Sequence, residues 1–228
     1  MNKWQKDFHE NLQNLQENIQ NDLADVQSNL AQMQEDLARQ RQAENAETEE
    51  DDTKELVILD WIQDHCRSPF LDRIVPLFSH LGDIGAIWIV MTFMLLINPA
   101  QRRLGIACTI SLVLSSIFCN LVLKLLVGRK RPCEYRPNKE LLIRRPKDDS
   151  FPSGHTSASF AVITVLFFMH FPYWPVFLAL GCLIAFSRMY VYVHFPSDIL
   201  GGAFLGFILG RVSVALLQVL PFLQVFVK

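Results

Sequence analysis

The stretch FPSGHTSASFAVITVLFFMHF, residues 151–171, begins with turn formers and continues as an almost unbroken apolar run. From Ser153 to Phe171 its length is similar to the roughly 20 residues that a helix needs to cross a bilayer. His155 therefore lies at the mouth of a predicted membrane-spanning helix. Because an ionisable side chain is costly there, His155 indicates a functional site, and its meaning depends on what gathers at the same membrane face.

Four other apolar runs have about the length of one bilayer crossing. They extend roughly over residues 77–97, 104–127, 173–193 and 197–227. Together with 153–171 they predict an all-α integral membrane helical bundle of about five spans.

The segment before these spans, residues 55–75, predicts an amphipathic helix that lies along the membrane interface. Leu56, Leu59 and Ile62 fall on one side of it, next to Trp61. A six-span alternative, in which this segment crosses the bilayer, is weaker because six ionisable side chains would enter the membrane: Asp60, Asp64, His65, Arg67, Asp72 and Arg73.

The N-terminal part has a different pattern. Apolar side chains recur every three or four residues from Trp4 to Leu37, between Gln, Asn, Asp and Glu. This eleven-residue repeat predicts one long amphipathic, coiled-coil-like helix, which either self-associates through residues 4–37 or is a solvated helix formed only in part. Residues 42–53 form an acidic linker without an apolar face. The predicted domains are therefore 1–41, 42–53 and 54–228.

The charge is divided unevenly along the chain. Residues 1–52 contain four Lys and Arg against thirteen Asp and Glu, whereas 53–228 contain seventeen against ten. This asymmetry predicts separate roles for the two parts, and the apolar runs predict a multi-pass protein of the cell membrane. The N-terminus has no apolar core of a signal peptide, so we expect no cleavage. Without a C-x-x-C pair or an acidic cluster we expect no metal or cofactor, and no nucleic-acid partner.

Three polar clusters border the predicted spans. The first, KLLVGRKRP, begins at Lys124, the second is PSGH at 152–155, and the third is SRMYVYVHFPSD at 187–198. Although the spans are assigned from apolar runs alone, an antiparallel five-span bundle brings all three clusters to the same membrane face.

The residue types in these clusters suit the binding of a phosphoryl group. Lys124, Arg131 and Arg188 are three cations without an equal set of carboxylates nearby, and a guanidinium matches phosphate oxygens. Ser153 and Gly154 open a helix whose free N–H groups favour an anion, and a glycine lets a ligand approach the backbone closely.

The same clusters also suit nucleophilic chemistry. Two histidines, His155 and His194, allow one to attack and the other to donate a proton. Asp198 follows His194 by four residues, and a carboxylate there can hold one imidazole nitrogen while the other stays free. Taken singly, such residues are usually snorkelling arginines, hydrogen-bonded histidines or a basic loop that sets topology. Their ordered spacing at one face favours a site instead.

The three clusters resemble the three-part signature of the type 2 phosphatidic acid phosphatases, which are related to the vanadium-dependent haloperoxidases. The resemblance extends roughly over residues 56–220 and excludes the N-terminal helix, while the span count departs from the commoner six. It implies a metal-independent phosphatase in which His194 forms a phosphohistidine, Asp198 orients His194, and His155 protonates the leaving oxygen. The implied ligands of the phosphoryl oxygens are Lys124, Arg131, Ser153, Gly154 and Arg188.

The substrate that this resemblance implies is a membrane lipid phosphate. Undecaprenyl diphosphate is favoured, and phosphatidic acid or phosphatidylglycerol phosphate is the alternative. A catalytically silent membrane scaffold is an alternative of another class, which the complete set of motif residues disfavours. The side of the membrane stays open, because the basic loop 128–150 favours the cytoplasm by the positive-inside rule, whereas the resemblance favours an outward site.

Overall fold

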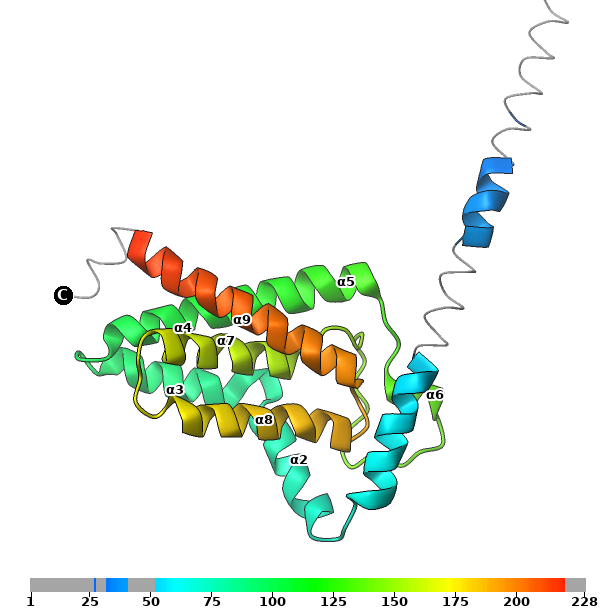
Figure 1. Ribbon diagram of the computed structural model, residues 1–228, viewed down its shortest axis with the longest axis horizontal. Coiled ribbons are helices and arrows are strands. Elements are labelled where there is room, and N and C mark those ends of the chain that lie inside the picture. The colour runs from blue at the N-terminus through cyan, green and yellow to red at the C-terminus, as the bar shows by residue number, and fades with distance from the viewer. Residues whose placement is uncertain (1–26, 28–31, 41–51, 220–228) are drawn as a thin grey trace, which may run out of the picture. The chain divides into compact units, whose positions relative to one another are not determined.

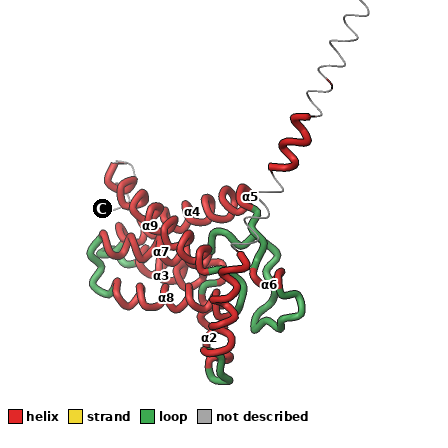
Figure 2. Tube along the Cα trace, turned by 45° about the vertical axis from the view of Figure 1, so that its right-hand side comes forward, coloured by secondary structure: helices red, strands yellow, loops and turns green. Residues whose placement is uncertain are grey.

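The computed structural model describes residues 27, 32–40 and 52–219, and these are helices and loops without a strand (Figure 2). The chain divides into two units, residues 1–51 and 52–228. In the first unit a helix extends over residues 32–40, and Met33 and Leu37 are exposed on it. Apart from residue 27, the rest of the predicted N-terminal helix, with the linker up to residue 51, lies outside the described residues.

The second unit begins with a helix over residues 52–65. Residues 71–97, which include the first predicted span at 77–97, then form α2 (Leu71–Leu81), the 3-10 helix η1 (Asp83–Gly85) and α3 (Ala86–Ile97). α2 thus begins within the segment 55–75 that was expected to be one interfacial helix. The second run forms α4 (Arg102–Ser115), the π-helix η2 (Ser116–Leu123) and α5 (Lys124–Val127). The short α6 (Pro132–Tyr135) follows, and then come α7 (Gly154–Phe168), α8 (Trp174–Tyr190) and α9 (Pro196–Val219).

Helix α7 lies at the centre of this bundle and packs against α4, α8 and α9 (Figure 1). The described residues thus confirm the predicted all-helical bundle. α7 can be central because beyond Ser159 it is apolar on every side except at Thr164, with Val162, Val165 and Leu166 fully buried. A helix that is apolar all round is stable only when neighbours or lipid cover it.

Helices α7 and α9 approach each other closely because of three glycines on α9. A Cβ atom added at Gly206 would lie 2.5 Å from the carbonyl oxygen of Ser157, and one at Gly210 would lie 2.5 Å from that of Ala161. Gly202 is similarly close to Ser153. The small-residue pattern therefore serves packing within one chain.

The described helices do not fix the number of membrane spans. Two stretches among them are long and apolar enough to cross a membrane, Arg102–Tyr135 and Pro196–Val219. The pair of α2 and α3 adds a third if the two helices, bent by 50° at their break, count as one span. α7 and α8 are apolar but shorter, with 15 and 17 residues. The five-span count stays a prediction.

The helix over residues 52–65 forms where an amphipathic helix was expected, but its apolar side faces the protein. Leu56, Leu59 and Ile62 are buried in one cluster with Tyr190 and Phe195. These three side chains are thus covered by the end of α8 and the turn between α8 and α9. Trp61 of the same prediction is exposed, together with Val57 and Ile58, so contact of this helix with the membrane interface stays a prediction.

Candidate active site

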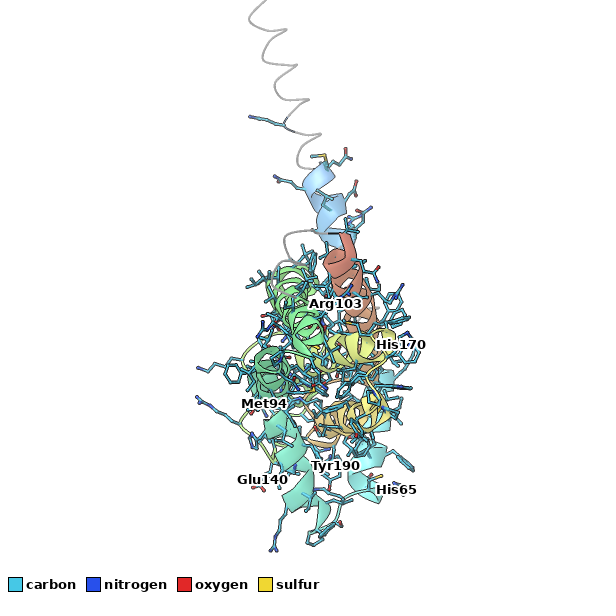
Figure 3. All side chains as sticks on the ribbon, turned by 90° about the vertical axis from the view of Figure 1, so that its left-hand side faces the viewer. His65, Met94, Arg103, Glu140, His170 and Tyr190 are labelled. Carbon is cyan, nitrogen blue, oxygen red and sulfur yellow. The ribbon has the colours of Figure 1, made fainter. Side chains whose placement is uncertain are left out.

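The three sequence clusters meet at one end of the bundle. α5 and the loop after it carry Lys124 and Arg131, the start of α7 carries His155, and the turn between α8 and α9 carries His194 (Figure 1). The other end is viewed in Figure 3, where Arg103 lies in the first turn of α4 and His170 on the connection between α7 and α8.

A cavity of about 990 Å³ opens between these clusters. Its apolar wall comes from α3 and α4 and includes Ile89, Phe93, Leu96, Leu112 and Val113. Its polar wall contains six of the eight predicted site residues, namely Lys124, Arg131, Gly154, His155, Arg188 and His194.

The other two predicted residues lie behind that polar wall. Ser153 caps α7, since its hydroxyl accepts hydrogen bonds from the N–H and the hydroxyl of Thr156. The backbone N–H of Ser153 donates to the carbonyl of Asp198 at 3.1 Å, which ties the start of α7 to the start of α9. A phosphate-binding role for Ser153 stays a prediction.

His194 is 1% exposed and has both ring nitrogens engaged. Its Nδ1 lies 3.4 Å from Oδ2 of Asp198, and its Nε2 lies 3.1 Å from Nη1 of Arg131. Burial, and then the charges of Arg131 and Arg188, lower the pKa of His194 well below 6.5. The imidazole is therefore neutral near pH 7, and with Nδ1–H directed at the carboxylate its Nε2 lone pair accepts a hydrogen bond from Nη1 of Arg131 on the cavity wall.

His155 has a carboxylate partner that the sequence did not indicate. Its Nε2 lies 3.0 Å from Oδ1 of Asp83, and Oδ2 of Asp83 lies 2.9 Å from Nδ1 of His80. Asp83 belongs to η1, inside the first predicted span. An acidic residue within an apolar run is the signal that could have identified it.

Lys124 and Arg131 share a second unexpected carboxylate. Nζ of Lys124 contacts Asp148, and Nη2 of Arg131 lies 3.1 Å from Oδ1 of Asp148. Burial alone would raise the pKa of Asp148, but the hydrogen bond from Lys124 and the charge of Arg131 outweigh it and lower that pKa to about 2. Nothing in the local sequence distinguishes Asp148 from the other acids of its loop.

Arg188 is a buried cation with an unused donor. It lies in the last turn of α8 with 3% of its surface exposed, and its Nη1 contacts the hydroxyl of Ser79. Within the described part of the chain its Nε has no hydrogen-bond partner. Because buried polar groups are nearly always paired, a guanidinium that lines the cavity and keeps an unpaired donor is suited to an incoming anion.

Among the described residues, no group of three or more His, Cys, Asp and Glu side chains is arranged to hold a metal ion. An all-helical, apolar bundle whose cavity is lined by the predicted histidines His155 and His194 and the predicted cations Lys124, Arg131 and Arg188 defines the class of protein. The chain belongs to the PAP2 superfamily, whose pattern matches residues 104–221. That stretch contains all eight predicted site residues.

The chain is similar to an undecaprenyl-diphosphatase of Sulfolobus acidocaldarius, with 35% identity over 131 residues. The match covers 56% of this chain and 62% of that relative, so the chain spans less than two thirds of its length. Among solved structures, Aquifex aeolicus LpxE has 28% identity and a TM-score of 0.62, covering 70% of this chain and 94% of that one. A PAP2-type phosphatidylglycerolphosphate phosphatase of Bacillus subtilis shares the fold, with a TM-score of 0.60, 22% identity and coverage of 74% and 86%.

Proposed function

We propose that this protein is a membrane-embedded, metal-independent phosphatase that removes a phosphoryl group from a lipid phosphate or diphosphate. The observation that carries the proposal is the cavity wall that brings a neutral His194, whose Nε2 is unprotonated and next to Arg131, together with Lys124 and Arg188. A positioned nucleophile and cations already in place are what phosphoryl transfer requires.

The proposed reaction has two steps. Nε2 of His194 attacks phosphorus, the bond between phosphorus and the lipid-side oxygen breaks, and His155 gives that oxygen a proton. Water then attacks the phosphohistidine, the N–P bond breaks, inorganic phosphate leaves, and His155 recovers a proton. Asp198 holds Nδ1 of His194 throughout. The phosphoryl oxygens are held by Lys124, Arg131, Arg188, Ser153 and the N–H of Gly154.

The apolar wall of the cavity supports a lipid substrate. Side chains of α3 and α4 such as Phe93 and Val113 are continuous with the polar wall, so a phosphate headgroup and the start of an apolar tail fit one cavity. Undecaprenyl diphosphate is the favoured substrate, because the similar Sulfolobus acidocaldarius protein is named for that lipid. Phosphatidic acid or phosphatidylglycerol phosphate is the alternative.

The test is phosphate release by the full-length protein in detergent from a panel of lipid phosphates and diphosphates, with EDTA present. Release should persist in EDTA, and vanadate should inhibit it, because vanadate adopts the trigonal bipyramidal shape of the transition state. Activity that disappears in EDTA and returns with magnesium would contradict a metal-independent mechanism. No release from any member of the panel would contradict the phosphatase proposal itself.

Replacing Asp148 by Asn should lower KM and strengthen vanadate inhibition several-fold, with a smaller change in kcat. The Asp148 carboxylate occupies Lys124 and Arg131, so a phosphoryl group has to displace it from both cations. Because the pKa of Asp148 is lowered to about 2, the anion is lost only as the pH falls toward that value. The difference between the variant and the wild type should therefore be constant across the neutral range.

The matched control for Asp148 is Glu140→Gln, which removes the same charge from an exposed position of the same loop and should leave KM unchanged. A KM that stays the same or rises in Asp148→Asn would show that this carboxylate does not compete with the substrate.

We also propose that residues 4–37 self-associate as a coiled coil, since their apolar stripe would be buried between chains. Sedimentation of the 1–52 peptide tests this. Association should be lost when Leu15, Ile19, Leu23 and Leu30 are made polar, and a wild-type peptide that is monomeric at high concentration would contradict the proposal.

A further inference from the structure

The carboxylate of Asp198 is fully buried behind His194. Its Oδ2, which faces Nδ1 of His194, also accepts hydrogen bonds from the hydroxyl of Ser150 at 2.5 Å and the N–H of Phe195 at 2.7 Å. Its Oδ1 accepts a hydrogen bond from Nη1 of Arg129 at 2.7 Å. A buried carboxylate is costly unless a cation pairs with it, so Arg129 is the group that compensates the charge of Asp198.

The guanidinium of Arg129 is itself fixed from several sides. It is 10% exposed, its Nε lies 2.8 Å from Oδ1 of Asp52, and its Nη2 lies 2.8 Å from Oε1 of Glu55. It also lies over the ring of Phe195, 4.2 Å from the ring centroid. These contacts leave the guanidinium little freedom to rotate, so Nη1 is directed at Asp198.

The two acidic partners of Arg129 come from the first turn of the helix over residues 52–65. Glu55 also accepts hydrogen bonds from the N–H of Ser197 at 2.9 Å and from its hydroxyl at 2.6 Å. Ser197 immediately precedes Asp198, and its hydroxyl lies 2.6 Å from Nη1 of Arg129. The start of α9 is therefore held by the same cluster that holds Arg129.

We propose that Arg129 is a positioning residue of this reaction. With Asp52 and Glu55 it holds Asp198 in the orientation in which Asp198 aligns His194, and it does not touch the phosphoryl group. This inference rests on the proposed function. Arg129 acts through Asp198, since Arg129 lies behind the residues that line the cavity. It makes the first turn of the helix over residues 52–65 part of the catalytic assembly.

The test compares phosphate release by the wild type, Arg129→Gln, Arg129→Lys and Arg136→Gln, each as the full-length protein. In Arg129→Gln, kcat should fall by roughly 100-fold, the scale of a misplaced catalytic group. KM and the inhibition constant of vanadate should change less than about threefold, because Lys124, Arg131 and Arg188 keep their places. Arg129→Lys should recover part of kcat, since it restores a cation without the fork of donors.

Arg136 is the matched control. It joins the same loop to the same helix through Asp60, at 3.6 Å, and does so at an exposed position. Arg136→Gln should therefore keep the kcat of the wild type. A structural role of the loop alone would predict similar effects of both substitutions, and that result would overturn the inference.

A second variant carries Asp52→Asn together with Glu55→Gln, which keeps the side-chain shapes and removes both charges. This variant should lower kcat without raising KM. If Arg129→Gln does not fold, the double variant tests the positioning role in its place. A wild-type kcat in this variant or in Arg129→Gln overturns the inference. A matching rise in KM and in the vanadate constant also overturns it, because Arg129 would then contact the phosphoryl group.

Failure of the proposed function gives a different result, namely no phosphate release by the wild type. Infrared spectroscopy then reads the same contact without turnover. The carboxylate stretch that Asp198→Asn removes should shift in Arg129→Gln, because Oδ1 loses the hydrogen bond from Nη1. A carboxylate band of Asp198 that is the same in the wild type and in Arg129→Gln would overturn the assignment of Arg129 as the partner of Asp198.

Discussion

Replacing His194 by Ala should abolish phosphate release, with a loss on the order of 10⁶-fold, the scale seen when a catalytic nucleophile is removed. The other two histidines on the cavity wall, His80 and His155, are both engaged with Asp83, so neither is placed to replace it. Asp198→Asn should keep the fold and lower kcat by roughly 10⁴-fold, since an amide no longer favours the imidazole tautomer with a free Nε2.

The control for His194 is His65→Ala. His65 is exposed on the helix over residues 52–65, where its ring stacks on Trp61, and its loss should leave turnover unchanged. The rates are measured as phosphate released per mole of purified, folded protein. A near-normal rate in His194→Ala would show that the nucleophile has been misassigned.

Replacing Arg188 by Gln should lower kcat/KM by roughly 10²- to 10³-fold, the loss that follows removal of one preorganised donor to the transition state. Arg188 is 3% exposed, its Nε is unpaired within the described residues, and it lines the cavity beside His194. Gln keeps part of the side-chain volume but ends two bonds short of the position of Nη1, so it removes the charge and the contact with Ser79 together. Vanadate inhibition should weaken along with kcat/KM, because the cavity wall loses a cation.

Arg211→Gln is the control for this second substitution. Arg211 is exposed on α9 and lies over the ring of Phe168, away from the cavity wall, so its replacement should leave kcat/KM unchanged. If Arg188→Gln lost activity while vanadate inhibited as strongly as before, Arg188 would support the fold and would not bind the phosphoryl oxygens.

The same sequence signal, the apolar runs, predicted both the helical bundle and the site residues that line the polar wall of the cavity. Apolar runs as long as a bilayer crossing predict helices, and short connections make neighbouring helices antiparallel, which places Lys124, His155 and Arg188 at one end. The glycines of α9 could also be read, because spacing by four puts small residues on one face. These signals are local in sequence, so one chain is enough to find them.

The residues that the sequence did not indicate act through contacts between distant segments. Arg129, Asp83 and Asp148 are ordinary charged residues until the fold brings them to Asp198, His155 and Lys124. The break in the first predicted span, between α2 and α3, also depends on a contact with a distant segment. Gly82 packs against His155, where an added Cβ atom would come within 2.6 Å of the imidazole, and Gly85 takes a φ of 71° that favours glycine.

The most direct measurement is acid-free trapping of the covalent intermediate. Full-length protein is mixed with a lipid phosphate labelled in its phosphoryl group, quenched in base, and digested to locate the label. The phosphohistidine mechanism predicts a label on His194 that is absent from His194→Ala and accumulates in step with the first turnover. A label on His155, or turnover by the wild type with no labelled histidine at any time, would contradict it.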